Sequence, residues 1–258
     1  LTLLPANADA VFPVHYAGLP VDLSNPGWKQ RPSLVVEDAA HALGVHTPNG
    51  PVGNCALSDM TCFSFHPVKP ITSGEGGMVT TNNSELAERL RRFRSHGIVK
   101  KPERGGWYYE IAEVGYHYRM TDIQAALGLS QFSRLDQFIA RRNELASRYR
   151  SELSSFGILL PPQEPEGFTH GYHLFAVRVP RREKVFEALL SAGVRAQVHY
   201  VPVHHHPASQ DAVIPTAGLP NCDLVYEGLL SLPLFPGLED EEFQSIIDAL
   251  HEVFATED

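Results

Sequence analysis

A lysine and a pair of carboxylates occupy positions in this sequence at which they could do chemistry together. Lys69 lies in "FSFHPVKPITSGEGG", after a short apolar run, and Glu37 and Asp38 end the apolar run "SLVVED". If the two runs are parallel strands, the loops that follow them meet at one edge of the sheet, where α/β proteins build their sites. A lysine amine can bind an aldehyde covalently, and a carboxylate can keep a pyridine ring nitrogen protonated. The pair therefore indicates a site for an aldehyde cofactor with a pyridine ring.

Neighbouring residues support this interpretation, and an ordinary solvent-exposed loop lysine is the alternative. Ser64 precedes Lys69 near the end of the same run and offers a hydroxyl to a phosphate oxygen. Gly74, Gly76 and Gly77 would let the backbone approach a ligand closely. Most lysines in proteins are exposed, and an aspartate and a lysine in two loops occur together in many proteins. The residues alone leave both interpretations open.

The elements that would position these residues alternate along the chain, which predicts an α/β fold with a mainly parallel sheet. Apolar or β-branched runs bounded by Gly, Pro, Asn or Asp predict buried strands at 10–18, 33–38, 60–65 and 77–81. The stretch 83–97 has helical apolar spacing and ends on Gly97. Thr121 and Gln124 have capping-box spacing and open one long or broken helix that would join two lobes.

The second half of the chain predicts a smaller α+β lobe. Its elements are expected at 173–179, 181–192, 195–201 and 240–254. We therefore expect two domains. Residues 1–140 would be the remainder of a large domain that ends in the connecting helix, and residues 141–258 would be a small C-terminal domain.

Composition and charge argue against several classes of partner. The formal net charge of −9 disfavours nucleic acid or an anionic membrane as the main partner. The 3 cysteines have no C-x-x-C spacing, so they predict neither a disulfide framework nor a zinc site and are typical of the cytoplasm. No apolar run approaches the roughly 18 residues that span a bilayer. We expect a soluble, cytoplasmic protein.

Six motifs, in this order, resemble those of the DegT/DnrJ/EryC1/StrS family of sugar aminotransferases. They are "VVEDAAHALG", "FSFHPVKPITSGEGGMVTT", "RRFRSHGI", "GYHYRMTDIQAALGLSQ", "VHYVPVH" and "SLPLFPGLEDEE", and they cover nearly the whole chain. The resemblance implies the fold of type I pyridoxal-phosphate-dependent transferases, which is aspartate aminotransferase-like, with pyridoxal 5'-phosphate as cofactor. It also implies a homodimer whose active sites are shared between subunits.

By this resemblance the chain would move an amino group from L-glutamate to the 4-keto carbon of a nucleotide-linked 4-keto-6-deoxy sugar, with UDP as the expected nucleotide. The product would serve surface polysaccharide or glycan synthesis. The stretch "SFHPVKPITSGEGG" most resembles the transaminases of pseudaminic acid synthesis that form UDP-4-amino-4,6-dideoxy-N-acetyl-β-L-altrosamine. Members that act on 4-amino-arabinose or perosamine precursors share much of it and are the alternative.

The resemblance also assigns roles at the cofactor. Lys69 would be the catalytic lysine, which anchors the cofactor and then moves a proton as base and acid in turn. Asp38 would pair with the ring nitrogen, and Ser64 would contact the phosphate. His41 would lie near the phenolic oxygen of the ring, with a structural interior histidine as the alternative.

One motif departs from the family pattern. "GYHYRMTD" carries His117 where the family has an asparagine that reaches the phosphate of a neighbouring subunit's cofactor. A histidine can also donate a hydrogen bond, so His117 remains a candidate for that contact. Arg119 is a candidate for binding the substrate or the carboxylate of the amino donor, and a surface arginine is the alternative.

The stretch "VHYVPVHHHPAS" supplies the remaining candidates. By resemblance His199, Tyr200 and His204 would form the wall of the sugar-nucleotide pocket. Adjacent histidines at 204–206 also suggest a metal site. Residues of an extended segment alternate in direction, however, so we expect these histidines not to converge on one ion and predict no metal.

Family members carry an N-terminal portion upstream of a segment like 10–18, with a Ser-Gly-Thr phosphate loop and an aromatic residue that stacks on the ring. This sequence has neither. Two interpretations stay open: an aminotransferase seen without its N-terminal part, or a truncated, non-catalytic remnant that acts as a dimerising or regulatory module. A family dehydratase would resemble this sequence with histidine in place of Lys69, so the lysine argues against it.

Overall fold

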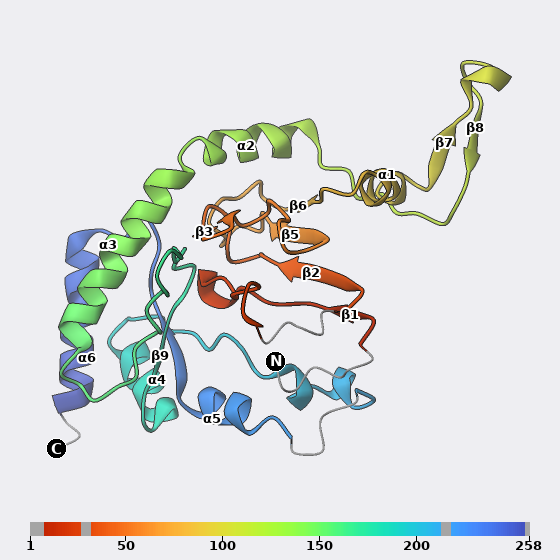
Figure 1. Ribbon diagram of the computed structural model, residues 1–258. Coiled ribbons are helices and arrows are strands. Elements are labelled where there is room, and N and C mark those ends of the chain that lie inside the picture. The colour runs from red at the N-terminus through yellow and green to blue at the C-terminus, as the bar shows by residue number, and fades with distance from the viewer. Residues whose placement is uncertain (1–7, 27–31, 213–217, 256–258) are drawn as a thin grey trace.

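The computed structural model describes residues 8–26, 32–212 and 218–255 of the chain. A sheet with its loops lies beside a second group of strands and helices, and the consecutive helices α2 and α3 run past both (Figure 1). A thin arm that carries β7 and β8 projects away from the rest of the molecule (Figure 1).

Four strands form the main sheet, in the order β1-β2-β5-β6. They are β1 (Ala10–Val11), β2 (Leu34–Asp38), β5 (Met60–Ser64) and β6 (Gly77–Thr80). β1, β2 and β5 are parallel, whereas β6 is antiparallel to β5. The predicted α/β fold with a mainly parallel sheet is confirmed. A small ladder of β3 (His46–Thr47) and β4 (Gly50–Pro51) lies in the connection from β2 to β5.

The first predicted strand, at 10–18, is much shorter than expected. Only β1 pairs continuously with β2, and Val14 makes a single bridge to Asp38. Pro13 has no N–H to donate, and residues 16–18 form a 3-10 turn in which Ala17 and Gly18 have φ values of 58° and 96°. The proline and the left-handed turn therefore end the strand, and the chain leaves the sheet at this point.

Glu37 lies in a buried hydrogen-bond network on β2. Its carboxylate accepts from His15 Nε2 at 2.8 Å, from Thr61 Oγ1 at 2.8 Å and from Ser58 Oγ. A backbone N–H donates to Nδ1 of His15, so the imidazole proton lies on Nε2. Burial raises the pKa of Glu37, but the hydrogen bonds outweigh it and leave the pKa below its ordinary value. The ionised carboxylate of Glu37 therefore has a structural role, because it links β2 to the segments that carry His15, Ser58 and Thr61.

Three helices follow the sheet, and the first two begin at the signals that the sequence offers. They are α1 (Ser84–Phe93), α2 (Asp122–Phe132) and α3 (Leu135–Leu153). The side chain of Asn83 caps the start of α1, and Thr121 and Gln124 form the reciprocal capping box of α2. A break at Ser133 and Arg134 separates α2 from α3, so the predicted connecting helix is a broken one.

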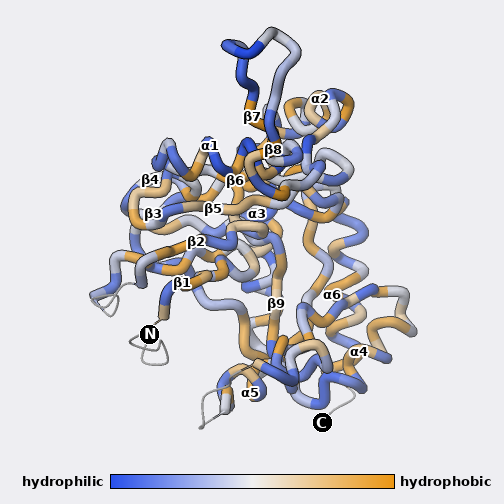
Figure 2. Tube along the Cα trace, turned by 90° about the vertical axis from the view of Figure 1, so that its right-hand side faces the viewer, coloured by the Kyte–Doolittle hydropathy of each residue, from blue (hydrophilic) through white to orange (hydrophobic). Residues whose placement is uncertain are grey.

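An antiparallel arm was not predicted from the sequence. It consists of β7 (Ile98–Lys100) and β8 (Tyr109–Ile111), joined by a tip that is hydrophilic along part of its length (Figure 2). Several large apolar side chains near it stay exposed, among them Trp107, Ile111 and Val114. Exposed apolar side chains that form one patch often mark an interface.

Gly97 fixes the point where the arm leaves α1, which leads to a testable prediction. Gly97 has a φ of 70°, and a Cβ placed there would overlap the backbone oxygen of Glu113. We expect Gly97→Ala to lower the free energy of unfolding by more than about 1 kcal/mol and to speed amide hydrogen exchange across 98–116. The control is Gly106→Ala, because a Cβ at Gly106 meets nothing within 4 Å. Equal exchange in both variants would contradict the prediction.

The second half of the chain forms the predicted α+β lobe with two unpredicted elements. Its elements are β9 (Phe175–Arg178), α4 (Arg182–Ser191), α5 (Pro220–Gly228), β10 (Leu229–Leu232) and α6 (Asp240–Ala255). β9 and β10 pair antiparallel. The strand expected at 195–201 is absent, and that segment makes one isolated bridge, from Gln197 to Ser231. α5 and β10 were not predicted.

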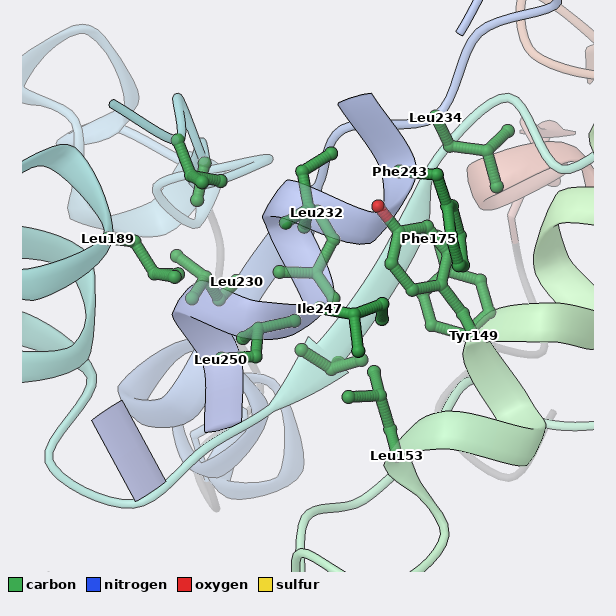
Figure 3. Close-up of a cluster of buried hydrophobic side chains, with 14 of the residues drawn as sticks. Tyr149, Leu153, Phe175, Leu189, Leu230, Leu232, Leu234, Phe243, Ile247 and Leu250 are labelled. Atoms are coloured by element: carbon green, nitrogen blue, oxygen red, sulfur yellow. The ribbon is translucent and has the colours of Figure 1, made fainter. Parts of the chain in front are cut away.

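Two clusters of buried apolar side chains hold the structure together. The larger lies between α3, α4, α6 and the β9–β10 pair, and its centre includes Tyr149, Phe175, Leu230, Phe243 and Ile247 (Figure 3). The smaller packs under the main sheet around Phe63, Phe65 and Ile71. α3 contributes Leu135 to the smaller cluster and Leu145 to the larger one. The division at residue 140 stays a prediction. Within the described ranges, no helix combines the length and the apolar character that crossing a membrane requires.

Candidate active site

Lys69 and Asp38 lie at the same edge of the sheet, as the sequence predicted. Asp38 ends β2 and pairs in register with Cys62 of the parallel strand β5, and the turn that follows β5 carries Lys69. Burial lowers the pKa of the Lys69 amine, and the negative charge of Asp38 opposes this only in part. An amine with a lowered pKa is more often neutral at ordinary pH and is then a nucleophile and a base.

The carboxylate of Asp38 is held by its own backbone turn. Its Oδ1 accepts from the N–H of Ala40 at 3.0 Å. Among the described residues, no hydrogen bond reaches Oδ2, which leaves that oxygen able to accept one from a ligand. Ser64 ends β5, and its hydroxyl oxygen accepts from the N–H of His66 at 3.3 Å. The hydroxyl proton of Ser64 therefore remains available for a ligand oxygen.

His41 is buried beside these groups and has one defined tautomer. The N–H of Ala17 donates to Nδ1 of His41 at 3.2 Å, which places the imidazole proton on Nε2. The ring stacks at a tilt on His173, with 4.3 Å between centroids. Burial lowers the pKa of His41 to about 4, and Lys69 adds to the effect. His41 is thus both the interior histidine of the alternative interpretation and a neutral N–H donor close to Lys69.

His199 and Tyr200 reach this edge from the other lobe. They line a cleft of about 610 Å³ together with Lys69 and His173. Tyr16 donates its hydroxyl to the backbone oxygen of His199 at 2.5 Å, and burial raises the pKa of Tyr16 to about 12. The hydroxyl therefore stays protonated and joins the turn after β1 to the far wall of the cleft. Two of the three predicted wall residues, His199 and Tyr200, therefore line the same cleft as Lys69.

The other three candidate residues lie elsewhere in this chain. His117 and Arg119 are exposed where the arm returns to α2, and Arg119 contacts Nε2 of His117 at 2.8 Å. Neither lines the cleft. His204 does not line it either, and contacts Asp223 of α5 instead. The roles expected for these three residues stay predictions.

Sequence reasoning missed Arg142, which lines the cleft although its side chain is almost fully buried. Its guanidinium donates from one nitrogen to the backbone oxygens of Tyr172, His173 and Leu234 at 3.0, 3.3 and 3.0 Å. Burial lowers the pKa of Arg142 to about 10. A signal was present, because Arg142 shares a helix face with Leu145 and Tyr149 at spacings of 3 and 7 residues.

Because the buried histidines have lowered pKa values, we expect the free energy of unfolding to fall in mild acid. Burial lowers the pKa of His170 and of His41 to about 4 each, with Arg150 adding to the effect at His170 and Lys69 at His41. The unfolded chain takes up these protons below about pH 6.5, whereas the folded chain does not, so stability is lost as the pH falls from about 6.5 to 4. Each histidine contributes on the order of 3 kcal/mol to this loss by pH 4.

Urea unfolding at a series of pH values checks this expectation. His170→Gln should flatten the curve between pH 6.5 and 4 relative to the unmodified chain, because it removes one titrating site. The exposed His206→Gln is the control and should leave the curve unchanged. A midpoint that does not move with pH in this window would contradict the prediction.

The chain matches one family of known sequences. The family model of the DegT/DnrJ/EryC1/StrS aminotransferase family matches residues 3–251. The chain is 36% identical to the uncharacterized protein MJ1066 of Methanocaldococcus jannaschii and 35% identical to the spore coat polysaccharide biosynthesis protein SpsC of Bacillus subtilis. Each match covers 95% of this chain and 66% of the relative, so the chain spans slightly less than two thirds of their length.

Solved structures of sugar aminotransferases resemble the structure. The putative sugar aminotransferase Spr1654 of Streptococcus pneumoniae, solved in PLP and PMP forms, aligns with a TM-score of 0.87 at 28% identity. In its PMP form the alignment covers 98% of this chain and 71% of that one. Helicobacter pylori PseC, an aminotransferase involved in the biosynthesis of pseudoaminic acid, aligns with a TM-score of 0.86 at 30% identity, over 99% of this chain and 69% of that one.

Proposed function

This chain belongs to the DegT/DnrJ/EryC1/StrS aminotransferase family, and from that premise we propose that it transfers an amino group from L-glutamate to the 4-keto carbon of a UDP-linked 4-keto-6-deoxy sugar. Its fold is that of the type I PLP-dependent transferases. The observation that carries the proposal is the meeting of Lys69, Asp38 and His41 at one sheet edge beside a cleft. The likeness to PseC supports a sugar of the pseudaminic acid type, and the product would serve surface glycan synthesis.

Aminotransferases of this family use pyridoxal phosphate, and the residues at the edge fit that group. The open oxygen of Asp38 suits a protonated ring nitrogen, and the half-buried amine of Lys69 suits the aldehyde. The Nε2–H of His41 suits the phenolic oxygen, and the hydroxyl of Ser64 suits a phosphate oxygen. When bound, the cofactor supplies an electron sink for the bonds of the substrate carbon.

The chain's own residues would divide the remaining work. Nζ of Lys69 takes and returns the proton at the reacting carbon, which its lowered pKa favours. Asp38 stays fixed by the N–H of Ala40, and His41 stays neutral because of its burial. His199 and Tyr200 close the far side of the cleft and limit the access of water to Lys69.

The lining of the cleft favours an anionic sugar ligand. Arg195, Gln197 and Ser231 line it together with Lys69 and offer donors for phosphate oxygens and sugar hydroxyls. This local group of donors accommodates a nucleotide-linked sugar in a chain whose net charge is −9. The members of the family that act on 4-amino-arabinose or perosamine precursors would need the same donors.

We further propose that the protein works as a homodimer in the cytoplasm. The exposed apolar residues of the arm and of α2, such as Trp107 and Ile123, would pack against a second copy. That packing would allow His117 to reach the other subunit's cofactor, because His117 is exposed at the root of the arm. All three cysteines are free, which suits a reducing compartment.

Single-turnover chemistry tests the proposal. The purified chain is loaded with pyridoxal phosphate and mixed with L-glutamate, and we expect one equivalent of 2-oxoglutarate per bound cofactor. A UDP-linked 4-keto-6-deoxy sugar should then regenerate the starting absorbance and yield the 4-amino sugar, detected by mass spectrometry. D-glutamate is the control donor. A chain that binds no cofactor under these conditions would favour the non-catalytic dimerising module instead.

A further inference from the structure

A cluster of ligand-type side chains lies outside the cleft, where the 3-10 turn η4 (Val203–His205) meets α5. His204 Nε2 lies 2.7 Å from Oδ1 of Asp223, and His205 Nε2 lies 2.9 Å from the same oxygen. The expectation that the three adjacent histidines diverge does not hold for His204 and His205. It assumed an extended segment, whereas the 3-10 turn brings the rings of His204 and His205 to the same carboxylate.

The spacing of the three ligand atoms suits a small divalent ion. The two imidazole nitrogens and the carboxylate oxygen all lie within 4.8 Å of one another. In a tetrahedral zinc site with bonds of about 2.1 Å, neighbouring ligand atoms lie about 3.4 Å apart. The two nitrogen-to-oxygen distances, 2.7 and 2.9 Å, lie below that spacing, and the distance between the two nitrogens is 4.8 Å or less. The two rings meet edge to face at 72°, with 4.4 Å between centroids, so they can approach one ion from different directions.

The exposure of the cluster leaves room for an ion to enter. The side chain of His204 is 14% exposed, and those of His205 and Asp223 are 39% and 42% exposed. One face therefore stays in contact with water, which can fill an open coordination position. Without an ion, both histidines must carry a proton on Nε2 to donate to one oxygen. An ion replaces both donors and neutralises the carboxylate directly.

We propose that His204, His205 and Asp223 form a zinc-binding site with water at the fourth position. The ion ties the turn at 203–205 to α5. Tyr200, which lines the cleft, precedes His204 by only four residues, so the ion would also restrict the movement of this part of the lining. The site is separate from Lys69 and does not depend on the proposed transamination.

Zinc binding is measured on the untagged chain, because a polyhistidine tag would itself bind the metal. The chain is stripped with EDTA, desalted and titrated with Zn²⁺ against a chromophoric chelator. We expect one tight equivalent per chain and a loss of affinity of at least tenfold in His205→Ala and in Asp223→Asn. His206→Ala is the matched control, because His206 is the exposed neighbour outside the cluster, and it should bind as the unmodified chain does.

A thermal melt supplies the second measurement. Zn²⁺ should raise the Tm of the unmodified chain and of His206→Ala but not of Asp223→Asn, because only a site in the folded state couples binding to stability. Circular dichroism confirms that each variant folds. Equal zinc affinity in His205→Ala and His206→Ala would overturn the proposal, as would an unmodified chain that binds no more zinc than Asp223→Asn. In either case the three side chains would only form hydrogen bonds that connect the 3-10 turn to α5.

Discussion

Lys69→Ala is expected to lower the rate of amino transfer by at least about 10³-fold and to abolish covalent attachment of pyridoxal phosphate. The amine is the half-buried nucleophile at the sheet edge, and its lowered pKa suits it for moving a proton. Loss of a positioned general base and acid alone removes about 10²–10⁴ in rate. Loss of the nucleophile removes the covalent step as well.

The attachment is read out without any sugar substrate. The chain is incubated with pyridoxal phosphate, reduced with borohydride and digested, and the mass increment is located by peptide sequencing. We expect the increment on the peptide that contains Lys69 and none in Lys69→Ala. Lys184→Ala is the control, because Lys184 is an exposed lysine on α4. An increment carried mainly by another lysine would contradict the assignment of Lys69.

Arg142→Ala is expected to lower the free energy of unfolding by about 3 kcal/mol. The guanidinium satisfies three backbone oxygens, from Tyr172, His173 and Leu234, and thereby joins α3 to two other segments. Each oxygen left without a donor in a buried site costs about 1–3 kcal/mol. The cost is moderated because burying the cation is itself unfavourable, as its lowered pKa shows, and because water can enter from the cleft.

Thermal and urea unfolding measure this loss, and we expect the Tm to fall by roughly 5–10 °C. Arg141→Ala is the control from the same helix. Arg141 forms surface ion pairs with Glu144 and Asp240 and donates one hydrogen bond to the backbone oxygen of Leu238, and exposed ion pairs contribute little to stability. If both variants melt at the same temperature, Arg142 is not the connection that its hydrogen bonds indicate.

The parts of the fold that could be predicted carry local signals. Asn83 and the Thr121–Gln124 pair mark helix starts through contacts within a few residues, so the caps of α1 and α2 followed from sequence. β10 could not be predicted, because its four residues are all buried and show no alternation, and a short run of this kind does not separate strand from helix. The arm was missed because β7 and β8 are three-residue strands with mixed polarity.

In the candidate site, too, some residues could be placed from the sequence and others could not. Lys69 and Asp38 could be placed together, because parallel strands bring their following loops to one edge. His173 and Tyr16 could not, because His173 comes from the second lobe and Tyr16 contacts the backbone of His199 from a left-handed turn. The direction of His204 was misjudged because a 3-10 turn replaced the expected extended segment. Contacts that depend on distant segments leave no local pattern.

The two adjacent carboxylates of β2 make the folding of this chain sensitive to a shift in strand alignment. Glu37 stands opposite Thr61 and Asp38 opposite Cys62, and neighbouring side chains of a strand point to opposite faces. A slip of one residue against β5 would exchange the faces, so that Asp38 would enter the interior and Glu37 would face the cleft. Such a chain would keep its strand and its charges yet hold the wrong carboxylate toward Lys69. The contacts of Glu37 with His15 and Ser58 therefore help to specify the register of β2, because only the correct alignment satisfies them.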